Sequence, residues 1–225
     1  MARAVIFDVD GTLVDSVGVH AQAWQDAFLE FDRSFALDKI RSQIGKGGDQ
    51  LLPVFLSKGE IEAFGKRLEK RRAEILKQHY LPKIRGFPGV RELVKRLLED
   101  KIQVVLASSA KKDELQVYKK IAGVDDLISQ ETTSDDAKKS KPHPDIFQAA
   151  IENLDSIPLR DIWVVGDSPY DAEAAGKAGL QTIGVLCGGF PEQVLRDAGC
   201  REIFRDPEDL LSRYEASPLS PRRAE

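Results

Sequence analysis

The stretch that decides the fold is Ala4-Val5-Ile6-Phe7-Asp8-Val9-Asp10-Gly11-Thr12-Leu13, close to the start of the chain. Four consecutive apolar residues are typical of a strand that is buried on both faces of a sheet. Two acids and a hydroxyl follow at once, and open parallel sheets bind ligands at the carboxyl ends of their strands. An acidic turn uses the same residue types, so this stretch by itself leaves a structural role open.

Further short runs rich in Val, Ile and Leu alternate with helical patterns along the rest of the chain. Val90, Leu93, Val94 and Leu97 share one helical face, for example, and a strand-like run follows them. This alternation predicts an α/β fold, with a Rossmann-like parallel sheet core and helices on both faces. The expected strands are Ala4–Phe7, Ile102–Ala107, Asp126–Ser129, Ile162–Val165 and Thr182–Leu186.

The region between the first strand and Pro88 contains helical patterns but no convincing strand. It is far longer than an ordinary strand-to-helix connection, so it predicts an inserted all-helical cap domain. We expect the core to comprise residues 1–15 and 86–215, and the cap residues 16–85, with linkers near Asp15 and Gly86. Residues 216–225 are polar and contain two prolines, which predicts a disordered tail.

The composition narrows the classes of partner and compartment. The 33 Lys and Arg and 37 Asp and Glu give a net charge of −4 without a basic block, which disfavours nucleic acid and acidic membranes. The first apolar run is too short for a signal peptide or a membrane span. Two cysteines cannot make the disulfide framework of a small secreted protein. We expect a cytoplasmic protein, a monomer or a weak homodimer.

Three more polar clusters lie where a parallel sheet would gather them. Ser108-Ser109 ends a predicted strand, Lys141 precedes a predicted helix, and Gly166-Asp167-Ser168-Pro169-Tyr170-Asp171 follows another strand. Taken singly, Ser108 is a plausible helix cap, Lys141 a solvated lysine and Asp167 a turn acid. Together with Asp8, they supply every kind of group that phosphoryl transfer needs.

In this order the four motifs resemble those of the haloacid dehalogenase superfamily, in its phosphoglycolate phosphatase and β-phosphoglucomutase branch with a helical cap. The resemblance covers nearly the whole chain. It implies that Asp8 is the nucleophile, forming an aspartyl-phosphate, and that Asp10 is the general acid and base. For both tasks Asp10 needs a raised pKa, which we expect where two carboxylates share a site.

The resemblance also implies a Mg²⁺ ion, in keeping with hard oxygen ligands and no His or Cys cluster. Its implied ligands are Asp8, the backbone carbonyl of Asp10 and Asp167, with Asp171 supporting the metal. Lys141 is expected to neutralise the transferring phosphoryl oxygens as part of the catalytic set. The residues expected to bind the substrate's phosphate are Gly11, Thr12, Ser108 and Ser109.

Substrate choice is expected to lie in the cap, because the core motifs grip only a phosphoryl group. Gly45-Lys46-Gly47-Gly48-Asp49 is a flexible polar loop that could present Lys46 to an anionic substrate. A helix connection with Asp49 as the N-cap is an equally good interpretation. His20, His79 and His143 lack metal-ligand spacing and are interpreted as surface or hydrogen-bonding residues.

These features predict an enzyme that hydrolyses small phosphorylated metabolites, such as a sugar phosphate or phosphoglycolate. A β-phosphoglucomutase-like phosphotransferase would use the same core motifs, and a catalytically silent binding protein would keep the same fold. Carbon–halogen cleavage is disfavoured, since it has no leaving oxygen for Asp10 to protonate.

Overall fold

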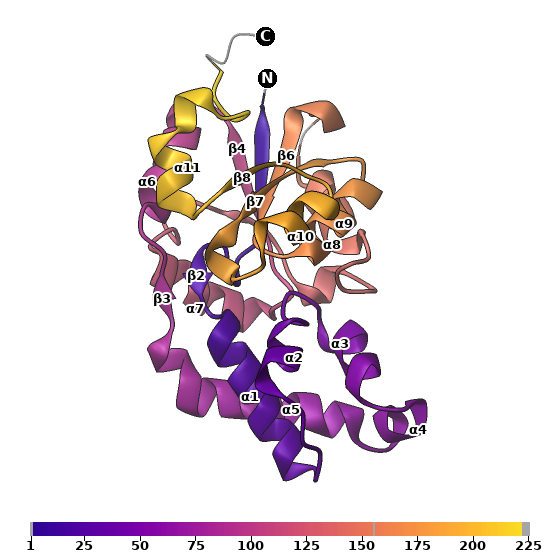
Figure 1. Cartoon of the computed structure of the whole chain (residues 1–225). Coiled ribbons are helices and arrows are strands. Elements are labelled where there is room, and N and C mark those ends of the chain that lie inside the picture. The colour runs from indigo at the N-terminus through magenta and orange to yellow at the C-terminus, as the bar shows by residue number, and fades with distance from the viewer. Residues whose placement is uncertain (1, 155, 222–225) are drawn as a thin grey trace.

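The computed structural model describes residues 2–154 and 156–221. A six-stranded, fully parallel sheet forms its centre, in the order β5-β4-β1-β6-β7-β8. The α/β prediction with a Rossmann-like sheet is therefore confirmed (Figure 1). The strands are β1 (Ala4–Phe7), β4 (Gln103–Ala107), β5 (Gln130–Thr132), β6 (Ile162–Gly166), β7 (Gln181–Val185) and β8 (Cys200–Phe204).

Strand β1 lies between β4 and β6, and all four of its residues are buried. Val5 and Phe7 belong to the hydrophobic cluster on one face of the sheet, whereas Ala4 and Ile6 belong to the cluster on the other. This alternation is the period of two that a pleated strand imposes on its side chains. It explains why the run is continuously apolar, and it fixes where Asp8 leaves the sheet.

Helices cover both faces of the sheet and enclose these two clusters. The first cluster includes Leu93, Leu115 and Leu210, and the second includes Phe147 and Ala174. The helices that carry these residues are α6 (Val90–Glu99), α7 (Lys112–Ala122) and α11 (Pro207–Ser212) on one face, and α8 (Asp145–Glu152) and α9 (Pro169–Lys177) on the other. Helix α10 (Glu192–Asp197) packs beside β8.

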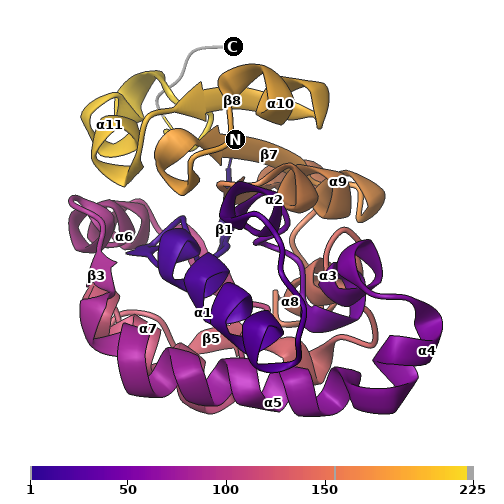
Figure 2. The same cartoon turned by 60° about the horizontal axis from the view of Figure 1, so that its bottom comes forward.

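The helices inserted between β2 and β3 have a hydrophobic core of their own, which includes Trp24, Phe28 and Leu68. Trp24 and Phe28 stack with their ring centroids 5.6 Å apart, so they act as core residues, as their helical spacing indicates. These helices lie together beneath one end of the sheet (Figures 1 and 2). They are α1 (Val17–Glu30), α2 (Leu37–Arg41), α3 (Gly48–Phe55), α4 (Lys58–Glu60), η1 (Ile61–Gly65), α5 (Lys66–Ile75), η2 (Leu76–Tyr80) and η3 (Leu81–Lys83).

The two crossings between core and cap are not simple linkers. Strand β2 (Val14–Asp15) pairs antiparallel with β3 (Arg85–Gly86), with Val14 opposite Gly86 and Asp15 opposite Arg85. The outgoing and returning segments therefore support each other through backbone hydrogen bonds.

Among the described residues, no helix is long and apolar enough to cross a membrane.

Two local predictions are wrong, and one strand is missing from the prediction. The strand expected at Asp126–Ser129 lies instead at Gln130–Thr132, because the buried Ile128 belongs to the loop that precedes the strand and not to the strand itself. Strand β8 was not predicted, since it lies at the sheet edge and its alternating pattern includes exposed Arg201. The tail is not disordered over residues 216–220, where Ser217 and Leu219 are fully buried; residues 222–225 lie outside the described part.

Candidate active site

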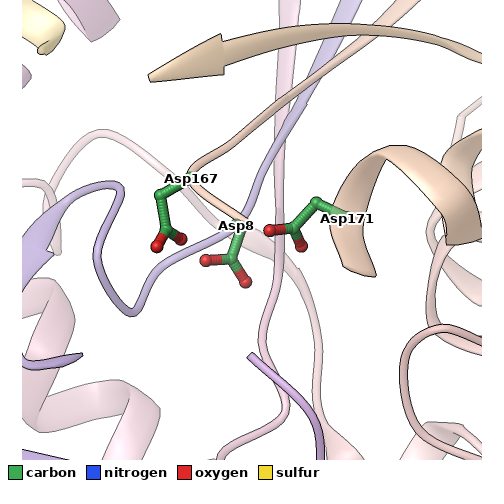
Figure 3. A group of neighbouring side chains, drawn as sticks. All are labelled: Asp8, Asp167 and Asp171. Carbon is green, nitrogen blue, oxygen red and sulfur yellow. The ribbon is translucent and has the colours of Figure 1, made fainter. Parts of the chain in front are cut away.

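Asp8 leaves the carboxyl end of β1, where its side chain is almost completely buried. Asp167 follows β6, the neighbouring strand, and Asp171 lies in the first turn of α9. One carboxylate oxygen from each of the three acids lies within 4.8 Å of the others. Figure 3 shows the three side chains pointing toward a common space. The structure thus brings together acids that are far apart in the sequence.

Lys141 provides the positive charge of this cluster. Its ammonium bonds Oδ1 of Asp8 and lies 2.7 Å from Oδ1 of Asp171, and the side chain is only 1% exposed. Burial lowers the pKa of Lys141, but the charges of Asp171 and Asp8 outweigh that effect and raise it above the ordinary value. Lys141 is therefore held as a cation against the acids, not as a solvated surface lysine.

Burial dominates the protonation of the acids themselves. It raises the pKa of Asp8 to about 7, with the charges of Asp171 and Asp10 adding to the effect and Lys141 opposing it. Burial and the charge of Asp8 likewise raise the pKa of Asp167 well above its ordinary value. One lysine thus leaves an excess of negative charge, and a divalent cation would offset it.

The donor set fits Mg²⁺. All the candidate donors are hard carboxylate oxygens, no His or Cys belongs to the cluster, and their mutual repulsion favours a small divalent ion. Asp171 has a second task, since its Oδ2 accepts hydrogen bonds from the backbone N–H and hydroxyl of Ser168, at 3.1 and 2.6 Å. This capping box starts α9 and fixes the Asp171 carboxylate.

Gly11 and Thr12 pack directly against the acids. The Thr12 hydroxyl lies 3.3 Å from both Oδ2 of Asp8 and Oδ1 of Asp167, so it links the two carboxylates. Gly11 has a φ of +83°, and a Cβ there would lie 2.5 Å from Oδ2 of Asp167. The turn after β1 therefore requires glycine for two reasons, its backbone conformation and this close approach.

Ser108 and Ser109 follow β4, the other neighbour of β1. Ser108 is fully buried, and its hydroxyl accepts a hydrogen bond from the backbone N–H of Ala110 at 3.1 Å. It does not cap α7, whose N-cap is Lys111. Ser109 is half-buried in the same loop. Binding of phosphate by these serines stays a prediction.

Asp10 does not join the cluster of three acids but turns toward the cap. Its Oδ1 accepts a hydrogen bond from Ser16 at 2.6 Å and lies 2.9 Å from Nε2 of His20. Burial raises the pKa of Asp10, but His20, through its charge and hydrogen bond, together with Ser16 and Lys141 outweighs burial and leaves the pKa below its ordinary value. The expectation of a raised pKa for Asp10 is therefore wrong; burial raises that of Asp8 instead.

His20, which the sequence did not indicate as a site residue, contacts Asp10. It is buried on α1, its Nε2 lies 3.1 Å from the Tyr118 hydroxyl, and Arg72 approaches its Nδ1 at 3.5 Å. A usable signal was present, because His20 falls on the buried face of α1 between Val17 and Trp24. Its pairing with Asp10 depends on how the cap sits on the core, which no local pattern reveals.

The cap loop at residues 45–49 touches the core, but not as predicted. The Lys46 ammonium donates to Oε1 of Gln43 at 2.6 Å and lies over the ring of Tyr170, so these two contacts turn it away from the acids. The N-cap of α3 is Gly47, so Asp49 is not the N-cap. The Asp49 carboxylate instead accepts hydrogen bonds from Ser140, the residue before Lys141.

Comparisons with known proteins agree with this geometry. The sequence model of the haloacid dehalogenase-like hydrolases matches residues 5–185. The phosphorylated carbohydrates phosphatase of Thermotoga maritima is 27% identical over 93% of this chain and 97% of its own length. The β-phosphoglucomutase of Bacillus subtilis is 30% identical over 81% and 83%. The crystal structure of a hydrolase from Pseudomonas syringae superimposes with a TM-score of 0.86 at 29% identity, over 94% of this chain and 97% of that one.

The chain belongs to the haloacid dehalogenase-like hydrolases, and within them to the branch of phosphoglycolate phosphatases and β-phosphoglucomutases. Its relatives named as phosphatases make it an enzyme of the phosphatase class. The fold is the one predicted from the alternation of strand-like and helical runs, and the family is the one that the four motifs resemble.

Proposed function

We propose that the protein hydrolyses small phosphate monoesters, in the presence of Mg²⁺, through a phosphoryl group carried on Asp8. The observation that supports this most strongly is the buried cluster of Asp8, Asp167 and Asp171 against Lys141 at the carboxyl edge of the sheet. Such a cluster combines a nucleophile, metal-binding oxygens and a fixed cation in one place.

In the first step an oxygen of the Asp8 carboxylate attacks phosphorus, and the bond from phosphorus to the ester oxygen breaks. Asp10 donates a proton to the leaving oxygen, so that an alcohol departs and an aspartyl-phosphate remains. In the second step Asp10 takes a proton from water, the water oxygen attacks phosphorus, and the bond to Asp8 breaks. Inorganic phosphate leaves, and both acids return to their starting forms.

The remaining side chains prepare this chemistry. Lys141 neutralises charge on the phosphoryl oxygens, and Thr12 holds the carboxylates of Asp8 and Asp167 in a fixed relation. Asp8, Asp167 and Asp171 would hold Mg²⁺, which supplies charge stabilisation for the phosphoryl group when bound. Asp10 has to exchange His20 and Ser16 for the substrate's leaving oxygen before it can act as an acid.

The substrate is proposed to be a phosphorylated metabolite small enough to fit between cap and core, such as a sugar phosphate or phosphoglycolate. Charges of both signs on the cap favour a polar substrate. Glu69 interacts electrostatically with Arg72 and with Asp49, and Arg72 in turn approaches His20. A cytoplasmic location and action as a monomer or weak homodimer complete the proposal.

The test is phosphate release from 2-phosphoglycolate, β-glucose 1-phosphate and p-nitrophenyl phosphate, with Mg²⁺ or with excess chelator. The proposal predicts turnover of at least one ester, loss of that turnover with chelator, and its abolition in Asp8→Asn. Conversion of β-glucose 1-phosphate to glucose 6-phosphate without phosphate release would show a phosphotransferase instead. No turnover of any phosphate ester would contradict the proposal.

A further inference from the structure

The loop that carries Lys141 is held from three directions. The backbone N–H of Lys139 donates to Oδ1 of Asp145 in α8 at 2.9 Å, so the core holds one end. Lys141 bonds Asp8 and Asp171, so the site holds the other. Ser140 lies between Lys139 and Lys141, and its backbone N–H and hydroxyl both face the cap.

The contact at Ser140 comes from a single short stretch of cap. The Ser140 hydroxyl donates to Oδ1 of Asp49, and its backbone N–H donates to Oδ2 of Asp49 at 3.2 Å. The same hydroxyl accepts a hydrogen bond from the backbone N–H of Gly47 at 2.9 Å. Helix α3, which begins at Gly48, thus meets the core on the side of α8 (Figures 1 and 2).

The fit between the two segments is close. A Cβ at Gly47 would lie 2.6 Å from both Cβ and Oγ of Ser140, so only glycine permits this approach. Burial raises the pKa of Asp49, but the hydrogen bonds from Ser140, together with those from Gln50 and the backbone of Asp49 itself, outweigh burial and leave the pKa below its ordinary value. Asp49 is therefore an ionised carboxylate, which makes the hydrogen bonds from Ser140 charge-assisted.

We propose that Asp49 is a positioning residue, which orders the loop at residues 139–141 through Ser140 and thereby sets the place of the Lys141 ammonium. The consequence for catalysis rests on the proposed function. A loop that is ordered from the cap couples cap closure to the charge that stabilises phosphoryl transfer. The role differs from substrate recognition, because it affects every phosphate ester alike.

The first test is kinetic, with p-nitrophenyl phosphate and 2-phosphoglycolate as two unrelated phosphate esters in Mg²⁺. Asp49→Ala and Ser140→Ala should each lower kcat by about 10-fold for both substrates, since small misplacements of a catalytic group cost this much or more. The double variant should lose little beyond either single one, and Asp49→Asn, which keeps one acceptor, should recover part of the rate. Asp38→Ala is the matched control, because Asp38 is also an acid in the first turn of a cap helix but is exposed.

The second test needs no turnover and therefore separates this proposal from the proposed function. Amide hydrogen exchange at residues 138–141 should be faster in Asp49→Ala than in the wild type and unchanged in Asp38→Ala. Unchanged exchange in Asp49→Ala would overturn the proposal even if the wild type released no phosphate. An unaltered kcat in an active enzyme, additive losses in the double variant, or an effect confined to one substrate would overturn it as well.

Discussion

Oδ1 of Asp10 lies 2.9 Å from Nε2 of His20, which joins the proposed acid and base in the core to the first helix of the cap. A carboxylate only accepts hydrogen bonds, so Nε2 of His20 carries the hydrogen in this contact. The same nitrogen lies 3.1 Å from the Tyr118 hydroxyl, which donates to Glu114 at 2.5 Å. Residues outside all four motifs therefore set the protonation and direction of Asp10.

Replacing His20 should change the pH dependence of the reaction. In His20→Ala the carboxyl of Asp10 loses the partner that lowers its pKa most and keeps the burial that raises it, so the pKa moves up. Because Asp10 must be protonated to act as the acid, the alkaline limb of kcat/KM should shift to higher pH. His79→Ala, at an exposed histidine, is the control. An alkaline limb at the wild-type pH in His20→Ala would show that His20 does not tune Asp10.

Asp8→Asn should stabilise the metal-free protein at alkaline pH while abolishing activity. The pKa of Asp8 is raised from 3.8 to about 7 on folding, so its contribution to stability is present below about pH 4 and is lost as the pH rises to about 7. Asparagine does not ionise, and Lys141 keeps Asp171 as a partner. At pH 8 the variant should therefore unfold with a free energy about 1–3 kcal/mol higher than the wild type.

Urea unfolding with chelator at pH 5 and pH 8 measures this difference. It should be larger at pH 8, since Asp8 is mostly protonated at pH 5 in the folded protein. Asp113→Asn, at an exposed acid on α7, should show no such change between the two values. A variant less stable than the wild type at pH 8 would mean that Asp8 is not strained by its neighbours.

Much of this arrangement could be predicted because the relevant signals are local. A buried strand must end somewhere, and a polar residue just after it lies at the sheet edge, as Asp8, Ser108 and Asp167 do. The meeting of these residues follows from the parallel order of their strands. Helical periodicity likewise indicates a helical core within the insertion, since Trp24 and Phe28 fall on one apolar face of a helix and pack there with other cap residues.

The features that could not be predicted depend on how the cap is placed against the core. The contacts from His20 to Asp10 and from Asp49 to Ser140 join residues whose relation is set by how the cap packs on the core. The predicted direction of the pKa shift of Asp10 was wrong for the same reason, because the partner that lowers this pKa most is His20, a cap residue. The tail was misjudged because Leu219 packs in the core despite its polar neighbours.

Mg²⁺ should stabilise the folded protein at pH 8 by relieving repulsion among the three acids. A ligand at 100 times its dissociation constant adds about 2.7 kcal/mol to the free energy of unfolding. For a protein of this size, each kcal/mol raises Tm by roughly 2–4 °C. Asp167→Asn removes a donor and should lose most of that rise, whereas Asp197→Asn, at an exposed acid on α10, should keep it. Equal rises in both variants would place the ion elsewhere.

Asp10→Asn should separate the two chemical steps when the leaving group is varied. The p-nitrophenolate ion leaves without a proton, so its release depends little on an acid, whereas attack by water still needs a base. The variant should release about one equivalent of p-nitrophenolate per enzyme in a burst and then turn over slowly. An alkyl phosphate, whose leaving oxygen needs the proton, should show no burst. Stopped-flow absorbance measures the first reaction, and a quenched-flow assay of the released alcohol measures the second. Near-normal steady rates with both esters would remove Asp10 from both roles, and slow release of p-nitrophenolate without a burst would show that Asp10 instead positions the phosphoryl group for attack by Asp8.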